Sequence, residues 1–326
     1  MHCHLLIPDF LPDEETRPGT RAAAAETLIA RGRRRRSAAV SYETWLFERF
    51  AVQKQRDWPV APYTLLADGG SPERHFWMRA DPVHIRASHD GLILAGGPGF
   101  DVSHEEAAAL VETLNRHFGG AMFFQAIEPM RWHVRLPKAP DMQTTPPSRA
   151  RGAPIGDQLP SGPDAMLFRT RINEAQMLLH EHPVNAARET RGEPVLNSIW
   201  FWGGGTMESP GIRPFSAVFG NDPLARGLAL AAEIPARPLP GHAGAMLSAA
   251  GGEGVALVAF DPPRSEEALA ALERDWFEPL LAALRSGRIG MLSLSLPGAD
   301  SLFEIETVRS DLRYFWRLRK PLAAYS

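Results

Sequence analysis

Three nearly continuous apolar runs constrain the fold of this 326-residue chain more than any other feature of its sequence. One run spans residues 4–9, and two others span residues 254–261 and 289–296, with an amphipathic stretch of helical periodicity at residues 265–284 between them. Apolar runs without alternation are typical of strands that are buried on both faces of a parallel sheet. Strands that alternate with helices in this way predict an α/β protein with a doubly wound sheet.

The middle of the chain has a different character. Residues 76–87 alternate between apolar and polar side chains, as a half-buried strand does. Ser103 stands three residues before Glu106, which predicts a capping box at the start of a helix that continues through residue 115. Further apolar runs follow before residue 137, and we therefore expect a compact α+β unit in this part of the chain.

Residues 182–205 combine several unusual choices. Arg offers a rigid fork of donors and Asn offers both a donor and an acceptor, so these side chains suit an anionic or polar ligand. The glycines at residues 203–205 follow an apolar run and predict a strand that ends in a turn, where the backbone lies close to another group. A buried strand with polar residues at its rim explains the pattern equally well. The candidate ligand-binding residues are Asn185, Arg188, Arg191, Asn197, Trp200 and Trp202.

Charge and cysteine content exclude several classes of protein. The net charge of −3 gives no basic surplus, which argues against nucleic acid as the main partner. Cys3 is the one cysteine, so no intramolecular disulfide can form and a cytoplasmic setting is favoured. No apolar run is long enough to span a membrane, and the N-terminus lacks the pattern of a signal peptide. We expect a cytoplasmic protein of bacterial type that has no membrane partner.

Two segments carry concentrated positive charge. Arg33–Arg36 follow a predicted helix at residues 21–32, and four adjacent cations attract phosphate groups or nucleic acid. A solvated surface is the favoured interpretation, because no aromatic residues are interleaved with the arginines. The aromatic and basic C-terminal tail at residues 313–322 is expected to dock against the protein itself, with a protein partner as the alternative.

Part of residues 182–205 resembles a motif of archaeal-type cofactor-independent phosphoglycerate mutases, which read His-Pro-x-Asn…Arg…Gly…Ala-Asn. The matching residues are His182, Pro183, Asn185, Arg188, Gly192, Pro194 and Asn197. Those mutases belong to the alkaline phosphatase superfamily, in which a substrate-binding α+β domain interrupts a phosphatase-like core. The resemblance implies a core formed by residues 1–75 and 206–326 and an inserted domain at residues 76–205. It is strongest to the proteobacterial mutase-like proteins that are named for regulating pathogenicity factors.

The same resemblance implies a dinuclear site, in which Mn²⁺ or Zn²⁺ ions clamp a phosphate and activate a Ser or Thr nucleophile. Asp9 and Asp261 match positions of metal ligands. The family's Asp-x-x-x-His motif has Ser265 in place of its His, and residues 293–298 lack the Asp-His pair that should end the next strand. Two carboxylates cannot hold two ions without further ligands. We therefore expect that the metal site is lost and that the protein has no cofactor.

Three functions remain open. The favoured one is a pseudoenzyme that binds a phosphorylated or carboxylated metabolite as a binding or regulatory protein. The second is an active phosphoglycerate mutase or phosphatase that uses Mn²⁺ or Zn²⁺; the nearest hydroxyls, Thr16, Thr20 and Ser37, match no nucleophile motif, and His242 is an isolated histidine in a loop. The third is a protein-interaction module that uses Arg33–Arg36 or the C-terminal tail.

Overall fold

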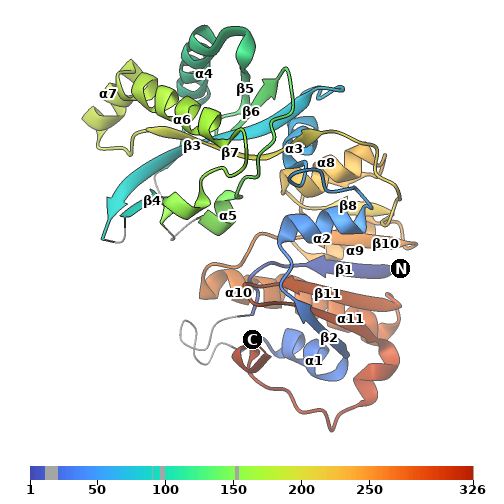
Figure 1. Cartoon of the computed structure of the whole chain (residues 1–326). Helices are drawn as coiled ribbons and strands as arrows, with labels where there is room; N and C mark the ends of the chain where they lie inside the picture. The colour runs from blue at the N-terminus through green and yellow to red at the C-terminus, as the bar shows by residue number, and fades with distance from the viewer. Residues whose placement is uncertain (12–20, 90, 96–99, 151–153, 326) are drawn as a thin grey trace. The chain divides into compact units, whose positions relative to one another are not determined.

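The computed structural model describes the chain except for residues 12–20, 90, 96–99, 151–153 and 326, and it divides into two compact units (Figure 1). Unit 1 comprises Met1–Val52 and Pro210–Ser326, and unit 2 comprises Gln53–Ser209. Unit 2 begins well before residue 76, because helix α3 (Val60–Ala67) packs against strands β3 (Phe76–Ser88) and β7 (Ser198–Thr206).

A seven-stranded sheet forms the centre of unit 1. Strand β1 (His2–Leu6) lies between β10 (Val255–Ala259) and β11 (Met291–Pro297) and is parallel to both. The full order is β2 (Arg33–Ala38), β12 (Ser301–Val308), β11, β1, β10, β8 (Ala217–Phe219) and β9 (Ala236–Arg237). The three apolar runs are thus adjacent parallel strands, and the predicted α/β fold class is confirmed.

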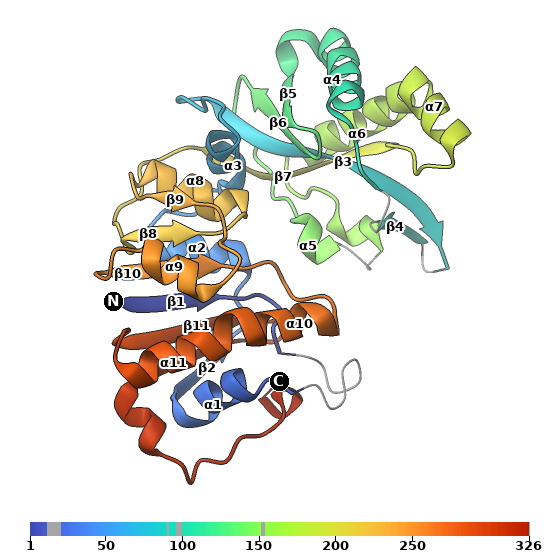
Figure 2. The ribbon, with the colours of Figure 1, turned by 180° about the vertical axis from the view of Figure 1, so that it is seen from behind.

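Helices cover both faces of this sheet, as in a doubly wound fold. One face packs against α1 (Ala23–Arg31), α9 (Ala243–Ala249), α10 (Glu266–Leu272) and α11 (Glu278–Ser286), which lie in front of the sheet in Figure 2. Cys3, Leu5 and Ile7 are fully buried against this layer. The other face is covered by α2 (Tyr42–Arg49), which lies beside α8 (Pro223–Ala231).

A π-helical turn joins α10 to α11, and one of its side chains caps the start of α1. The turn spans Glu273–Phe277. The first residues of α1 lack a capping side chain of their own, since Ala22 stands at the N-cap. Glu273 replaces that cap: its carboxylate accepts hydrogen bonds from the backbone N–H groups of Ala24 (2.5 Å) and Ala25 (3.2 Å).

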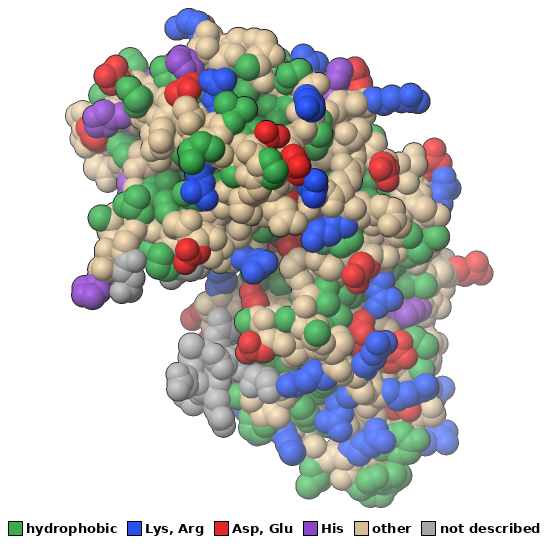
Figure 3. Space-filling view, in the orientation of Figure 1, with side chains coloured by type: hydrophobic (Ala, Val, Ile, Leu, Met, Phe, Trp, Pro, Cys, Tyr) green, Lys and Arg blue, Asp and Glu red, His purple; other side chains and the backbone are tan. Residues whose placement is uncertain are grey.

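Strand β2 is the exposed edge of the unit 1 sheet. It contains Arg33–Arg36, whose side chains are all exposed, and Lys and Arg side chains gather over this part of unit 1 in Figure 3. The strand pairs with β12, where Glu306 and Glu304 stand opposite Arg33 and Arg35. The arginines thus form a solvated edge, and charged side chains at an edge discourage pairing with another chain.

Unit 2 is an antiparallel sheet with helices on it. Strand β3 pairs on one side with β7 and on the other with β6 (Arg131–Leu136) and β4 (Gly91–Ala95), and β5 (Phe123–Glu128) lies outside β6. Helices α4 (His104–Phe118) and α6 (Ala165–His180) cover one face through a shared hydrophobic core, and α3 covers part of the other. The predicted capping box of Ser103 and Glu106 begins α4. The remaining helices are α5 (Pro147–Ala150) and α7 (Pro183–Arg191). None of the described helices has the length and apolar character that a membrane span requires.

Candidate functional site

Asp9 and Asp261 both follow strands at the carboxyl edge of the unit 1 sheet. Their strands, β1 and β10, are neighbours, with Leu6 in register with Ala259. In open α/β sheets this edge is where ligands usually bind. Asp9 has a φ angle of 49° in the left-handed region, and its backbone N–H donates to the carbonyl oxygen of Pro297 (2.9 Å). The tight turn therefore presents the Asp9 side chain at the end of the strand.

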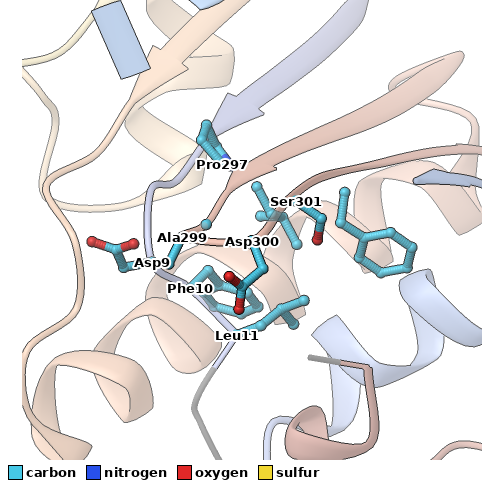
Figure 4. A pocket seen from close by; sticks show the side chains of 10 residues that line it. Asp9, Phe10, Leu11, Pro297, Ala299, Asp300 and Ser301 are labelled. Carbon is cyan, nitrogen blue, oxygen red and sulfur yellow. The ribbon is translucent and has the colours of Figure 1, made fainter. Parts of the chain in front are cut away.

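Asp9 lines a cavity of about 240 Å³ with Asp300 (Figure 4). The remaining lining comes from Phe10, Leu11, Phe303 and residues 296–301, none of which adds a His or Cys side chain. In Figure 4 the carboxylates of Asp9 and Asp300 point in different directions. The described lining of the cavity offers two separated acidic groups and no basic side chain, so these residues do not by themselves attract a phosphate.

Asp261 lines a different cavity, of about 430 Å³, together with Asp275 and Trp276. The carboxylate of Asp275 is paired with Arg274 at 2.7 Å, and this partner lowers the pKa of Asp275. Nearby His242 is the N-cap of α9, where its Nδ1 accepts a hydrogen bond from the backbone N–H of Ala245 (3.2 Å). The imidazole of His242 thus caps a helix.

The described residues do not fit a dinuclear metal centre. Among them, no three His, Cys, Asp or Glu side chains come close enough together to hold one metal ion. Ser37 lies on the edge strand β2, separated from β1 by β12 and β11, and so does not adjoin Asp9. Thr16 and Thr20 lie outside the described residues.

Asp222 is a third carboxylate at this edge, and the sequence had indicated it only as the start of a helix. It follows β8 and caps α8, accepting a hydrogen bond from the backbone N–H of Ala225 (2.8 Å). Burial, with a smaller contribution from the nearby charge of Asp261, raises the pKa of Asp222 to about 6. The hydroxyl of Tyr42 lies beside it and favours the charged form. Its place directly after a strand of the sheet was the signal that could have identified it.

The predicted ligand-binding residues all lie in unit 2. The side chains of the two asparagines among them form hydrogen bonds with backbone groups. The Asn185 side chain is 3% exposed and donates to the carbonyl oxygens of Leu179 (2.7 Å) and Leu196 (2.9 Å). Asn197 bonds in a similar way to the backbone N–H and C=O of Ile85 in β3 (both 2.7 Å). Both amides therefore hold the connection from α7 to β7 in place.

Arg188 and Arg191 lie near the end of α7 and share two acidic partners. Glu106 of α4 accepts a hydrogen bond from each arginine at 2.7 Å, and Glu193 pairs with Arg191 at 2.7 Å. Arg188 is 1% exposed, and its Nε donates to the carbonyl oxygen of Pro194 (2.8 Å). Its Nη2 is buried without a hydrogen-bond partner among the described residues. The two cations are balanced by two carboxylates.

Trp200 and Trp202 lie on β7, facing polar groups of unit 2. The indole N–H of Trp200 donates to the carbonyl oxygen of Thr145 (2.8 Å), and that of Trp202 donates to Asp81 (2.7 Å). The guanidinium of Arg79 lies 5.3 Å from the centre of the Trp202 ring and donates to Asp81 through Nε (3.0 Å). A buried row of a cation, a carboxylate and an indole therefore crosses β3 and β7.

His133 of β6 extends this row, since it pairs directly with Arg79 across the strands. It is fully buried, and burial, with the charges of Arg79 and Arg131, holds its pKa well below the usual range, so the ring is neutral near pH 7. Its Nε2 lies 3.0 Å from the Thr64 hydroxyl, while Nδ1 is buried with no partner among the described residues. Nothing in the sequence around His133 or Arg79 distinguished them from ordinary strand residues.

The glycines of residues 182–205 do not form the predicted turn. Gly203–Gly205 continue strand β7, and the segment before it forms helix α7, which begins at Pro183 with His182 as its cap. A Cβ on Gly205 would lie 2.4 Å from Cβ of Pro59, and one on Gly203 would lie 2.8 Å from Cβ of Val60. The predicted close approach exists, but the neighbour is the start of α3.

Comparison with known proteins finds a similarity to the same family within unit 2. Residues 73–185 match the family model described as 2,3-bisphosphoglycerate-independent phosphoglycerate mutase. The enzyme of that name from Methanothrix thermoacetophila is 34% identical over 119 residues, which cover 36% of this chain and 30% of the enzyme. A probable mutase from Geobacter sulfurreducens is 30% identical over 164 residues, covering 50% of this chain and 40% of the relative. The matched region thus spans less than half the length of these relatives.

Solved structures extend the similarity to the fold of the chain. The cofactor-independent phosphoglycerate mutase of Thermoplasma acidophilum gives a TM-score of 0.51 with 16% identity, over 99% of this chain and 94% of that one. A protein from Pyrococcus horikoshii gives a TM-score of 0.57 with 14% identity, over 94% and 87% of the two chains. Part of unit 2 is therefore similar in sequence to cofactor-independent phosphoglycerate mutases, as the motif at residues 182–197 had indicated, and the fold of the chain is similar to that of one of them.

Proposed function

We propose that this phosphoglycerate mutase-like chain binds a phosphorylated or carboxylated metabolite in unit 2 and acts as a binding or regulatory protein, without metal-dependent phosphoryl transfer. The observation that carries the proposal is the buried row of Arg79, Asp81 and Trp202 with His133 beside it, in which the cation and the histidine belong to the segment that matches the mutase family. The acidic cavities at Asp9 and Asp261 also support the proposal. Among the described residues, neither cavity brings together enough metal ligands to hold the ions that would bind a phosphate.

The hydrogen-bond pattern around His133 indicates what kind of ligand would suit the row. The Thr64 Oγ1 lies 3.1 Å from the carbonyl oxygens of Val60 and Ala61, so its one proton is directed to them. Thr64 then accepts the Nε2–H of His133, which leaves Nδ1 as an acceptor. A buried acceptor without a donor costs about 1–3 kcal/mol. A ligand hydroxyl would satisfy it, and Arg79 would lie beside the ligand's anionic group.

Titration calorimetry with 3-phosphoglycerate, a hydroxylated anion, tests the proposal directly. We expect the unaltered chain to bind 3-phosphoglycerate. His133→Gln and Trp202→Phe should each lower the affinity by about tenfold or more, equivalent to about 1.4 kcal/mol for each hydrogen bond lost. The matched control is Arg135→Gln, an exposed cation on the same strand as His133. No binding, or binding unaffected by both variants, would contradict the proposed site.

A mutase assay decides between this function and the enzyme. Conversion of 3- to 2-phosphoglycerate is measured with added Mn²⁺ or Zn²⁺, for the unaltered chain and for Asp9→Ala and Asp261→Ala. We expect no conversion in any sample. Conversion that both substitutions abolish would establish an active metal-dependent mutase in place of the binding protein.

A further inference from the structure

The C-terminal loop, residues 313–321 of unit 1, exposes more apolar surface than its surroundings. Phe315, Trp316 and Leu318 are 73%, 62% and 79% exposed. The loop connects two short 3₁₀ turns at Arg309–Arg313 and Leu322–Tyr325. It projects at one end of unit 1 in Figures 1 and 2, and hydrophobic side chains appear at that end in Figure 3. Large exposed apolar groups that adjoin each other usually mark an interaction site.

The loop is held at both ends, so its exposed side chains are not those of a frayed terminus. At its start, Arg31 donates to the carbonyl oxygen of Leu312 (2.9 Å). Within it, Arg317 donates to the carbonyl oxygen of Arg31 (3.0 Å) and stacks over Tyr314 at 4.7 Å. After it, Leu322 and Tyr325 are buried in the core of unit 1. The loop therefore presents its rings in a fixed arrangement.

Every charged side chain within the loop is positive. Residues 313–321 contain Arg313, Arg317, Arg319 and Lys320 and no Asp or Glu. Of the salt bridges between described residues, none involves these four side chains or Arg33–Arg36. The edge strand β2 joins the same surface, because Arg36 donates to the carbonyl oxygen of Tyr325 just beyond the loop. The two basic segments of the sequence thus form one surface.

We propose that the C-terminal loop, with Arg34 and Arg36 of β2 beside it, is a peripheral docking surface for an anionic lipid bilayer. Aromatic rings favour the boundary between acyl chains and headgroups, and flanking cations are attracted to anionic headgroups. A projecting apolar loop can insert into a fluid bilayer, which has no preformed groove. A protein partner would have to supply a complementary groove for the same loop. The sequence predicted no membrane partner because it has no span, but a loop that lies on the surface requires none.

Vesicle pelleting with the full chain tests this surface. The probes are vesicles of phosphatidylcholine alone and of phosphatidylcholine with about one-third phosphatidylglycerol. We expect pelleting with the anionic vesicles that falls as salt rises, and little with the neutral ones. Arg319→Gln with Lys320→Gln should lower binding roughly fivefold for each cation removed. Phe315→Ser with Trp316→Ser should lower it at least as much, because the inserted area is lost.

Control variants separate this surface from general stickiness. Met166→Ser with Met177→Ser removes apolar side chains of α6 that are 71% and 72% exposed, and should leave binding unchanged. All the altered side chains are exposed, so circular dichroism and the unfolding midpoint should match the unaltered chain. Equal pelleting with neutral vesicles, or loop variants that bind like the parent, would overturn the proposal. So would loop-dependent capture on immobilised polyglutamate without vesicle binding, which would indicate an acidic protein as the partner.

Discussion

Asn185 forms two hydrogen bonds with the backbone of one residue, Leu196: its Nδ2 donates to the carbonyl oxygen (2.9 Å) and its Oδ1 accepts from the N–H (2.8 Å). The amide thus pairs with the peptide of Leu196 as a neighbouring strand would. Asn197 pairs with Ile85 in the same way. The two asparagines that resemble the family motif therefore fix the path of the chain between α7 and β7.

Asn185→Asp tests this structural role. The carboxylate keeps the acceptor but loses the donor, and it places a charge against the carbonyl oxygens of Leu179 and Leu196. We expect a loss of about 2–4 kcal/mol in the free energy of unfolding, measured with urea. Asn221→Asp is the matched control, because the exposed Asn221 side chain accepts from the N–H of Leu239 (3.2 Å) and donates to none of the described residues. It should stay within about 0.5 kcal/mol of the parent.

Glu106→Ala should be among the most destabilising single substitutions in unit 2. Glu106 completes the capping box of α4 and neutralises Arg188, which is 1% exposed. Removing it leaves a buried cation without its main partner, at a cost of about 3–5 kcal/mol in unfolding free energy. Glu112→Ala on the same helix breaks only an exposed pair with Arg116 and should cost under about 0.5 kcal/mol. Equal effects of the two substitutions would be inconsistent with this account.

Asp222→Asn should stabilise the protein at neutral pH. The unfolded carboxyl loses its proton near 3.8 and the folded one near 6, so the folded state binds more protons between these values and stability falls as pH rises through them. Asn retains the helix cap and removes this cost, a gain of about 1–3 kcal/mol at pH 7 that disappears below pH 3.8. Urea unfolding at pH 7 and below pH 3.8 measures this gain in the free energy of unfolding. The exposed Asp300→Asn should change neither value, and a loss of stability in Asp222→Asn at pH 7 would disprove the expectation.

His4 should make the protein sensitive to acid. It is buried beside Trp45, and its Nε2 forms a hydrogen bond with the hydroxyl of Ser295 (2.9 Å). Burial lowers the pKa of His4 from 6.5 to about 3. As pH falls through this window, the unfolded state takes up a proton that the folded state does not, so stability is lost at roughly 1.4 kcal/mol per pH unit. The difference between the parent and His4→Gln, followed by urea unfolding, should show this slope. His180→Gln, at an exposed site, should not.

Local signals predicted the elements whose cause is local. The apolar runs gave β1, β10 and β11, and the spacing of Ser103 and Glu106 gave α4, because strand burial and helix capping depend on neighbouring residues. At the glycines after Trp202 the predicted close approach was right, but the predicted turn was wrong, because these residues continue β7 against the start of α3, which lies far away in the sequence. Strand β2 was not foreseen because its partner, β12, is equally distant.

The candidate site was harder to predict for the same reason. Arg188 and Asn197 look like ligand-binding side chains in sequence, but Glu106 and Ile85 engage them from distant elements. Arg79 and His133 drew no attention, because each resembles an ordinary strand residue until β3 and β6 bring them together. A polar side chain can be judged available for a ligand only once its partners within the fold are known.

The position of β1 between β10 and β11 has a consequence for synthesis on the ribosome. Unit 2 is one continuous segment and can close its sheet once β7 has emerged. Strand β1 leaves the ribosome before unit 2, yet both of its neighbours in the sheet follow only after unit 2 has emerged. Cys3, Leu5 and Ile7 must therefore stay apart from other nascent chains while unit 2 is synthesised, which makes β1 more in need of a chaperone than the strands of unit 2.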